Sequence, residues 1–155
     1  LTQALLYPGI GLLEATNLSV GRGTDTPFEV IGAPWIDNRL LSLRMNRADL
    51  PGVRFVPVDF TPNEHIFSGK RCHGINIIIT DRLTFDPVLT ALETAYTLYT
   101  QFSGKWNVKA LALLLGNEVA FKAFLDGKTP SELMTIYQPD LEAFSKRRAP
   151  FLLYR

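Results

Sequence analysis

The sequence predicts a single α+β domain in which a mixed or largely antiparallel sheet packs with about four helices. Its 155 residues suit one domain with a sizeable core. A hydrophobic share of 46% and a charged share of 20% lie in the range of ordinary globular proteins. Segments typical of strands and of helices mix along the chain without the regular β-α-β alternation of a doubly wound sheet, so α+β is the better class.

Four short segments rich in β-forming residues predict the strands. Residues 75–80 are the most strand-like of them and should be buried on both faces. Residues 53–60 include Pro57, which lacks a donor for the ladder and therefore favours a sheet edge or a bulge. An apolar stretch at residues 1–7, ended by a Pro8-Gly9 turn, precedes these strands. The two remaining predicted strands are residues 10–15 and 30–33.

Capping residues and apolar periodicity predict four helices. Asp86-Pro87 combines an N-cap with proline at the first helical position, and it opens a helix that ends at Ser103-Gly104. Thr129-Pro130-Ser131-Glu132 is a capping box that opens another, which Pro139 kinks or splits and Pro150 ends. The other two helices are residues 39–48, capped by Asp37 or Asn38 with Leu40, Leu43 and Leu50 on the apolar side, and a helix capped by Asn117 and ended at Asp126-Gly127.

Charge and apolar run lengths exclude several classes of partner. Sixteen Lys and Arg against fifteen Asp and Glu leave a net charge of +1, so we expect no nucleic-acid partner and no polybasic membrane module. The longest apolar runs are far shorter than the roughly 20 residues of a membrane-spanning helix, so no such segment is expected. The chain begins at Leu1 without an initiator methionine or a signal pattern, which predicts a piece of a longer protein.

No motif in the chain predicts a cofactor or a metal. Gly9-Ile10-Gly11 lacks the third glycine of a dinucleotide-binding fingerprint. Glu64-His65 and Cys72-His73 lack the ligand spacing of a zinc site, and a single cysteine excludes an intramolecular disulfide. We interpret both pairs as polar loop groups beside a small buried cysteine.

The most polar segment of the first half, residues 16–28, is the candidate binding loop. With Glu14 it gathers a carboxylate, an amide, hydroxyls and a guanidinium just after an apolar segment, and Arg22 has the geometry to clamp a carboxylate in a bidentate manner. The alternative is a structural turn in which Arg22 pairs with Glu14 or Asp25 while Asn17 bonds local backbone. Trp35 either stacks on a sugar face or packs in the core. The residues alone leave both choices open.

Several motifs, in order along nearly the whole chain, closely resemble the C-terminal half of the bacterial exo-β-N-acetylmuramidase family NamZ. The matching stretches are residues 7–9, 13–24, 27–29, 31–36, 50–55, 60–62, 72–74, 80–82, 85–88 and 148–154. Two features depart from the family pattern: Ala15 stands where glycine is usual, and residues 106–125 are unusually apolar.

The resemblance implies a glycoside hydrolase that releases terminal N-acetylmuramic acid from peptidoglycan fragments. By this resemblance, family members carry the main catalytic machinery on a Rossmann-like N-terminal domain, which is missing from this chain. A cleft lies between that domain and a C-terminal domain like this one. By this resemblance Glu14 is the catalytic candidate, and the substrate-binding candidates are Asn17, Ser19, Arg22, Thr24 and Trp35. Arg22 would recognise the lactyl carboxylate of the sugar.

Two further expectations follow from the resemblance, and one hypothesis competes with it. The 155 residues alone should be inactive, because glycoside hydrolysis needs two acid/base groups and the motif-rich loop offers only Glu14. A cell-wall substrate favours an extracytoplasmic location, periplasmic or secreted. The competing hypothesis is a non-catalytic module that binds the cell wall or another protein.

Overall fold

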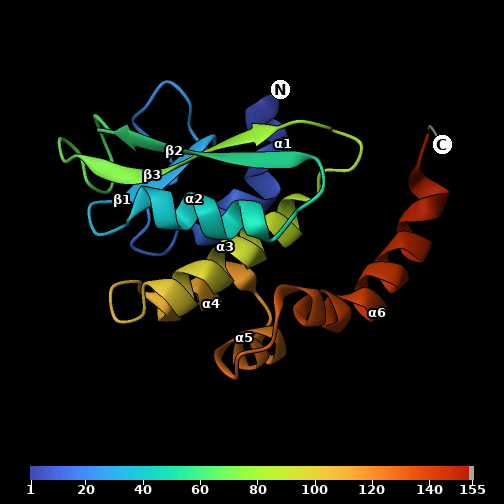
Figure 1. Ribbon diagram of the computed structural model, residues 1–155. Helices are drawn as coiled ribbons and strands as arrows, with labels where there is room; N and C mark the ends of the chain where they lie inside the picture. The colour runs from blue at the N-terminus through green and yellow to red at the C-terminus, as the bar shows by residue number, and fades with distance from the viewer. Residues whose placement is uncertain (154–155) are drawn as a thin grey trace.

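A small antiparallel sheet confirms the predicted α+β class. The computed structural model describes residues 1–153, and within them the strands are β1 (Val30–Ala33), β2 (Val53–Phe60) and β3 (Cys72–Ile79). Their order is β1-β3-β2, and both neighbouring pairs are antiparallel (Figure 1). The strand with Pro57 lies at an edge, as predicted, and the isoleucine-rich strand lies in the middle.

Two glycines set the spacing between β1 and β3. Gly32 and Gly74 face each other in the register of the pair. A Cβ on Gly74 would lie 1.8 Å from the carbonyl oxygen of Ile31, and one on Gly32 would lie 2.6 Å from that of His73. The same Gly32 also exchanges two 2.9 Å backbone hydrogen bonds with Ser19, which fastens the candidate binding loop to the sheet.

The four predicted helices are present with the predicted caps. Asp37, Asp86 and Asn117 accept a hydrogen bond from a backbone N–H in the first turn of their helices, and Thr129 forms the capping box with Glu132. Pro139 lies inside one continuous helix, which ends two residues before Pro150. The helices are α2 (Asn38–Arg47), α3 (Pro87–Gln101), α5 (Glu118–Leu125) and α6 (Pro130–Arg148).

The predicted apolar side of α2 is partly wrong. Leu41 and Met45 are buried, whereas Leu43 is 48% exposed. The buried pair keeps the i, i+4 spacing of one helix face. Because α2 packs on β2, β3 and α3, only the side of the helix that carries Leu43 is open to solvent.

Two further helices were not predicted, and the predicted strand at residues 10–15 is wrong. The chain forms α1 (Thr2–Ile10) followed by a 3-10 turn (Gly11–Leu13), so Pro8-Gly9 lies inside a helix, and the apolar run after Trp106 holds α4 (Leu111–Leu115). Leu6, Ile10 and Leu13 are fully buried at helical spacing. Gly9 lets α1 approach α3 closely, since a Cβ there would lie 1.8 Å from the Pro87 carbonyl oxygen.

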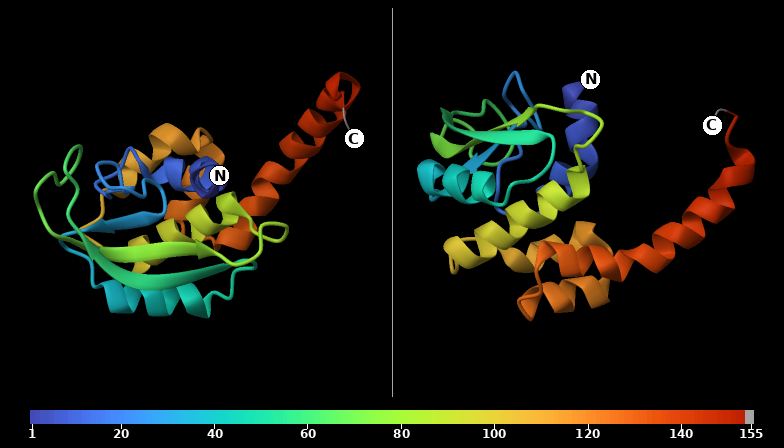
Figure 2. Two further views of the ribbon diagram at one scale, coloured as in Figure 1. Left: turned by 90° about the horizontal axis from the view of Figure 1, so that it is seen from above. Right: turned by 45° about the vertical axis from the view of Figure 1, so that its right-hand side comes forward.

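The elements form a sheet, a helical layer and a projecting segment, which is the second half of α6. The helix α2 lies against the sheet, and α3 crosses beneath it and packs on α1, α2 and α6 (Figure 2). The first turns of α6 pack on α3 and α5, and its second half extends away from the domain. Within residues 1–153 no helix has the length and apolar character needed to cross a bilayer.

Candidate functional site

Glu14 and Arg22 form an ion pair beside the sheet. The 3-10 turn after α1 ends at Glu14, and the following loop brings Arg22 back to it. The Arg22 Nε donates to Oε1 of Glu14, and Nη2 donates to Oε2 at 3.2 Å. This pairing is one of the alternatives that the sequence left open. The bond to Glu14 raises the pKa of Arg22, so the guanidinium stays charged at any working pH.

Two glycines with positive φ shape the turn that presents Arg22. Gly21 and Gly23 both have φ of 80°, a conformation that disfavours other residues. Added Cβ atoms would lie 2.6 Å from the Val30 carbonyl oxygen and 2.6 Å from the Glu64 backbone nitrogen, respectively. The turn therefore accepts only glycine at both positions, and Arg22 is held between them.

Two aromatic residues, Phe28 and Tyr7, lie next to the Arg22 guanidinium. The Arg22 Cζ lies 5.0 Å from the centre of the Phe28 ring, which is within cation–π distance. Tyr7 on α1 meets the same ring edge-on, with centroids 4.9 Å apart. Neither aromatic residue was predicted as part of the site, although both lie in the matching stretches.

A small pocket opens beside the ion pair. It has a volume of about 120 Å³ and is lined by Glu14, Thr16, Leu18, Ser19, Val20 and Arg22 together with His65 and Ile66. The side chains of Glu14 and Arg22 are 32% and 37% exposed, so solvent reaches both. Within the described residues Nη1 of Arg22 has no hydrogen-bond partner. The pocket therefore offers a charged donor next to a carboxylate.

The remaining candidate residues of the loop are bound within the domain. The Asn17 side chain donates to the Lys105 carbonyl at 2.8 Å and accepts from the Asn107 N–H at 2.6 Å. The Thr24 hydroxyl donates to the Gly21 carbonyl at 2.6 Å. Ser19 lines the pocket but is 1% exposed, and its hydroxyl accepts a 3.3 Å bond from the Gly21 N–H. The structure thus brings Glu14, Ser19 and Arg22 together at the pocket and gives Asn17 and Thr24 backbone partners.

Trp35 lies apart from the pocket. It follows β1 and packs on Phe102 at the end of α3, with ring centroids 6.0 Å apart. Its indole nitrogen is buried and has no partner in the described part of the chain. Of the two alternatives for Trp35, stacking on a sugar or packing within the domain, this position fits packing.

The loop at residues 61–71 supplies the wall of the pocket that sequence reasoning missed. His65 and Phe67 both have positive φ, at 60° and 64°. Asn63 donates its backbone N–H to the Gly23 carbonyl at 2.8 Å, which fixes this loop over the Arg22 turn. The sequence signal was Glu64-His65, which we interpret from the sequence as polar loop groups and not as part of a binding pocket. Among residues 1–153 no group of three or more His, Cys, Asp or Glu is placed to hold a metal ion.

A second polar group lies where the loop at residues 61–71 joins the end of β2 to the start of β3. Asp59 accepts a 2.6 Å hydrogen bond from Arg71 and lies 2.6 Å from Nδ1 of His73, and Asn38 donates to it at 2.9 Å. The bonds from Arg71 and His73 lower the pKa of Asp59. Burial raises the pKa of the neighbouring Cys72 thiol to about 11, so it is protonated and unreactive at neutral pH.

The fold is that of a known class of domain. Two crystal structures of DUF1343 family proteins from Bacteroides fragilis superpose on 99% of the chain, with TM-scores of 0.85 and 0.70 at 21% and 25% sequence identity. The chain covers 42% and 41% of those proteins.

Sequence comparison then defines the family. The model of a family described as "Exo-beta-N-acetylmuramidase NamZ, C-terminal" matches residues 5–154, and the chain belongs to that family. It is 37% identical over 155 residues to the peptidoglycan β-N-acetylmuramidase NamZ of Bacillus subtilis. That alignment covers 98% of this chain and 37% of the relative, so the chain spans little more than a third of the relative's length. Tyr154, in the last matching stretch, lies outside the described residues.

Proposed function

We propose that this chain is the cleft-forming C-terminal domain of an exo-β-N-acetylmuramidase, and that Arg22 binds the lactyl carboxylate of a terminal N-acetylmuramic acid. The family membership supports a glycoside hydrolase domain. The observation that carries the finer assignment is that Arg22 lines the pocket with a side chain that is 37% exposed, while its Nη1 has no hydrogen-bond partner among the described residues. A guanidinium is the side chain best suited to a carboxylate, because its donors lie in one plane.

We infer a positioning role for Glu14 from its contacts with Arg22. Both of its oxygens accept from Arg22, so the carboxylate holds the guanidinium in place while Nη1 remains for the ligand. In this role Glu14 acts through Arg22 and does not transfer a proton to or from the substrate. The acid/base groups of the reaction are then supplied outside this chain, by an N-terminal Rossmann-like domain that closes the cleft. The expected setting is extracytoplasmic, where the cell-wall glycan is found.

The pocket is too small to enclose a sugar. Its volume of about 120 Å³ suits a carboxylate group with its bound water, while the sugar ring would lie between this domain and its partner. The domain on its own should therefore bind the acidic substituent weakly and carry out no hydrolysis. Asn17 and Thr24 shape the loop in this proposal, and Ser19 forms the pocket floor.

Titration of the isolated domain with two sugars tests this proposal. N-acetylmuramic acid and N-acetylglucosamine differ by the lactyl group, so only the first should shift the Arg22 Nε–H resonance and the amides of residues 14–24 in an NMR titration. Arg22→Gln should abolish the shifts. Equal shifts with both sugars, or shifts that persist in Arg22→Gln, would remove Arg22 as the carboxylate ligand. Binding of intact cell wall that does not depend on Arg22 would instead favour the non-catalytic module.

A further inference from the structure

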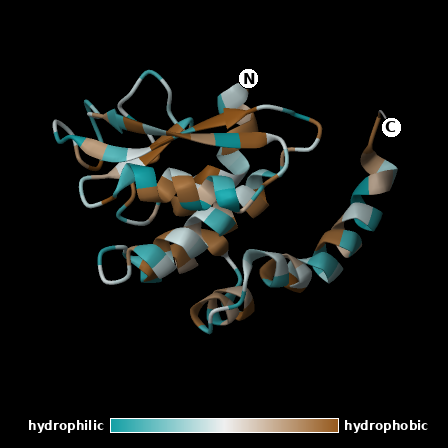
Figure 3. Ribbon diagram, viewed as in Figure 1, coloured by the Kyte–Doolittle hydropathy of each residue, from teal (hydrophilic) through white to brown (hydrophobic). Residues whose placement is uncertain are grey.

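Ile66 is an exposed apolar residue in the polar loop at residues 61–71. It is 39% exposed, and most residues around it on the loop are polar, charged or glycine. Figure 3 shows the same contrast at the left end of the sheet, where the connecting loops are mainly teal and white and the strands carry most of the brown. Because Ile66 lines the pocket beside Glu14 and Arg22, this apolar side chain is available to a ligand.

Two residues with positive φ hold Ile66 in place. His65 precedes it with φ of 60° and Phe67 follows it with φ of 64°, a conformation that a bulky residue such as phenylalanine rarely adopts. Two backbone hydrogen bonds fix this conformation, from the Ser68 N–H to the His65 carbonyl at 3.2 Å and from the Lys70 N–H to the Phe67 carbonyl at 2.9 Å. Strained residues that their surroundings fix in this way cluster at ligand-binding sites. The loop therefore places Ile66 at a defined position on the pocket.

The lining of the pocket combines charged and apolar side chains. Glu14 and Arg22 supply the charges, and Leu18, Val20 and Ile66 supply the apolar surface. Leu18 and Val20 are 1% and 3% exposed, so they form the inner surface, whereas Ile66 lies at the open edge. The volume of about 120 Å³ limits an occupant to a few atoms. A ligand that fills this pocket must therefore join an acidic group to a small apolar group.

We propose that Ile66 contacts the methyl group of the lactyl substituent and makes this methyl group a determinant of specificity. The inference rests on the proposed function, in which Arg22 binds the lactyl carboxylate. The methyl group and the carboxylate are bonded to the same carbon atom, so a pocket that holds one also surrounds the other. Contact with Ile66, Leu18 and Val20 removes the methyl group from water, which is favourable for any apolar group. The site then distinguishes substrates by the charge of the substituent and by its methyl group.

The contact with the methyl group should give a moderate preference. Burial of one such carbon changes an equilibrium or rate constant about fourfold, and closely fitting apolar pockets reach about tenfold or more. Because Ile66 lies at the open edge of the pocket, we expect a preference of about 4- to 10-fold for a lactyl over a carboxymethyl substituent. Both substituents carry the carboxylate, so Arg22 does not distinguish between them.

Two glycosides with the same leaving group test the inference on a longer polypeptide that includes the preceding domain. One is the glycoside of N-acetylmuramic acid, and the other is that of its 3-O-carboxymethyl analogue, which lacks only the methyl group. The ratio of their kcat/KM values should be about 4 to 10 in the unaltered protein and should fall to about 1 in Ile66→Ala. Ile78→Ala is the matched control and should keep the ratio, since Ile78 is 43% exposed on β3 and lies outside the pocket. Each ratio is measured on one sample, so a change in the amount of folded enzyme cancels.

The outcomes separate this inference from the proposed function. A ratio near 1 in the unaltered protein, or a ratio that Ile66→Ala leaves unchanged, would overturn the role of Ile66 and leave Arg22 as the carboxylate ligand. A ratio that falls equally in Ile78→Ala would overturn it as well. Arg22→Ala should slow the reaction of both glycosides by a similar factor and so keep their ratio. If Arg22→Ala reacts with both glycosides at the unaltered rate, the carboxylate assignment itself is refuted.

Discussion

The side-chain amide of Asn17 closes the turn at Lys105, 88 residues further along the chain. Nδ2 donates to the Lys105 carbonyl at 2.8 Å, and Oδ1 accepts from the Asn107 N–H at 2.6 Å. The amide thus completes two backbone hydrogen bonds that no regular element supplies. It joins the candidate binding loop to the turn that follows α3, and so fixes the position of the loop relative to the helical layer.

Asn17→Ala should lower the free energy of unfolding by about 2 kcal/mol, because two backbone groups lose their partners. Urea unfolding followed by circular dichroism measures this. Asn63→Ala is the control, since the Asn63 side chain is exposed and makes no hydrogen bond with the described residues, and it should change stability by less than about 0.5 kcal/mol. Equal effects of the two variants would show that the Asn17 bonds do not contribute.

Gly74→Ala should prevent the sheet from forming. The new Cβ would lie 1.8 Å from the Ile31 carbonyl oxygen, so β1 and β3 would have to separate where they pair. The expected result is insoluble or unfolded protein, seen as loss of the cooperative thermal transition. At Gly69 nothing lies within 4 Å, and only its φ of 70° opposes a side chain. Gly69→Ala should cost about 1 kcal/mol and leave a folded domain.

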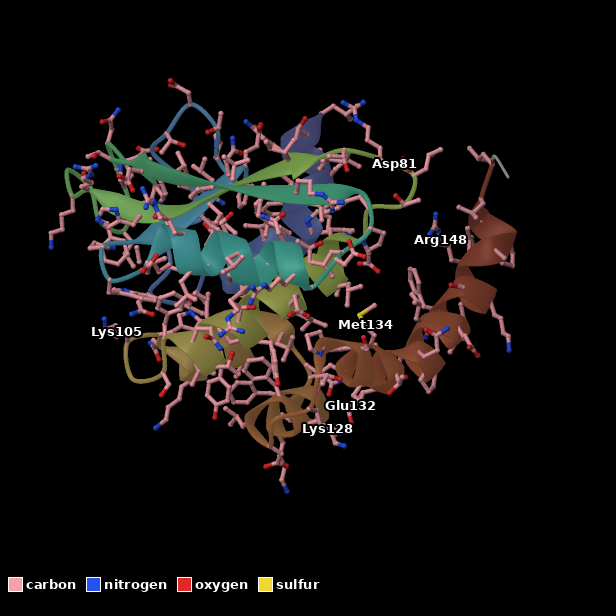
Figure 4. All side chains as sticks on the ribbon, in the orientation of Figure 1. Asp81, Lys105, Lys128, Glu132, Met134 and Arg148 are labelled. Carbon is pink, nitrogen blue, oxygen red and sulfur yellow. The ribbon has the colours of Figure 1, made fainter. Side chains whose placement is uncertain are left out.

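The Glu132 carboxyl should titrate near pH 2. Hydrogen bonds from Lys128 and from Thr129 lower its pKa from 4.5 to about 2 at the base of α6 (Figure 4). A pKa that is lower in the folded state contributes stability above pH 4.5, and this is lost as the pH falls from 4.5 towards 2. NMR titration of the carboxyl carbon measures the pKa, and Thr129→Ala should raise it. A midpoint near 4.5 would show that the capping box does not persist in solution.

Glu14→Gln separates a positioning role from a catalytic one. In the longer polypeptide the amide can still accept from Arg22 but cannot act as an acid or base, so we expect KM to rise by less than about tenfold with kcat nearly unchanged. A loss of kcat of about a hundredfold or more would assign Glu14 to proton transfer and overturn the positioning role. The pH profile of kcat/KM provides a second readout. If Glu14 transfers a proton, Glu14→Gln should remove one limb of that profile, whereas a positioning role leaves both limbs in place.

Local signals were enough to predict most of the second half of the fold. Asp86-Pro87 and the Thr129 capping box fix where helices begin through their own side chains, so no tertiary information is needed. Pro57 likewise places its strand at the edge. The prediction for residues 1–15 was wrong because α1 begins without a side-chain cap and contains Pro8. The stability of this helix comes from packing Leu6 and Ile10 against the domain.

The candidate site was predictable by residue type more than by geometry. The glycine-rich turn and Arg22 are consecutive, so their association is local. Two parts of the site depend on tertiary contacts that no spacing in the sequence encodes. One is the pocket wall formed by His65 and Ile66, and the other is the contact of Arg22 with Phe28, which Tyr7 meets edge-on. The roles of Asn17 and Thr24 as substrate ligands stay predictions, and their bonds to backbone oxygens and N–H groups explain the shape of the loop.

The most direct test compares Arg22→Ala with the unaltered longer polypeptide on two glycosides, one of N-acetylmuramic acid and one of N-acetylglucosamine. Loss of a charge-assisted bond to the lactyl group, about 1.5–3 kcal/mol, should lower kcat/KM for the muramic acid glycoside by roughly 10- to 150-fold. The glucosamine glycoside, which has no carboxylate, should react at an unchanged rate. A muramic acid kcat/KM that does not change, or an equal loss on both glycosides, would contradict the assignment of Arg22.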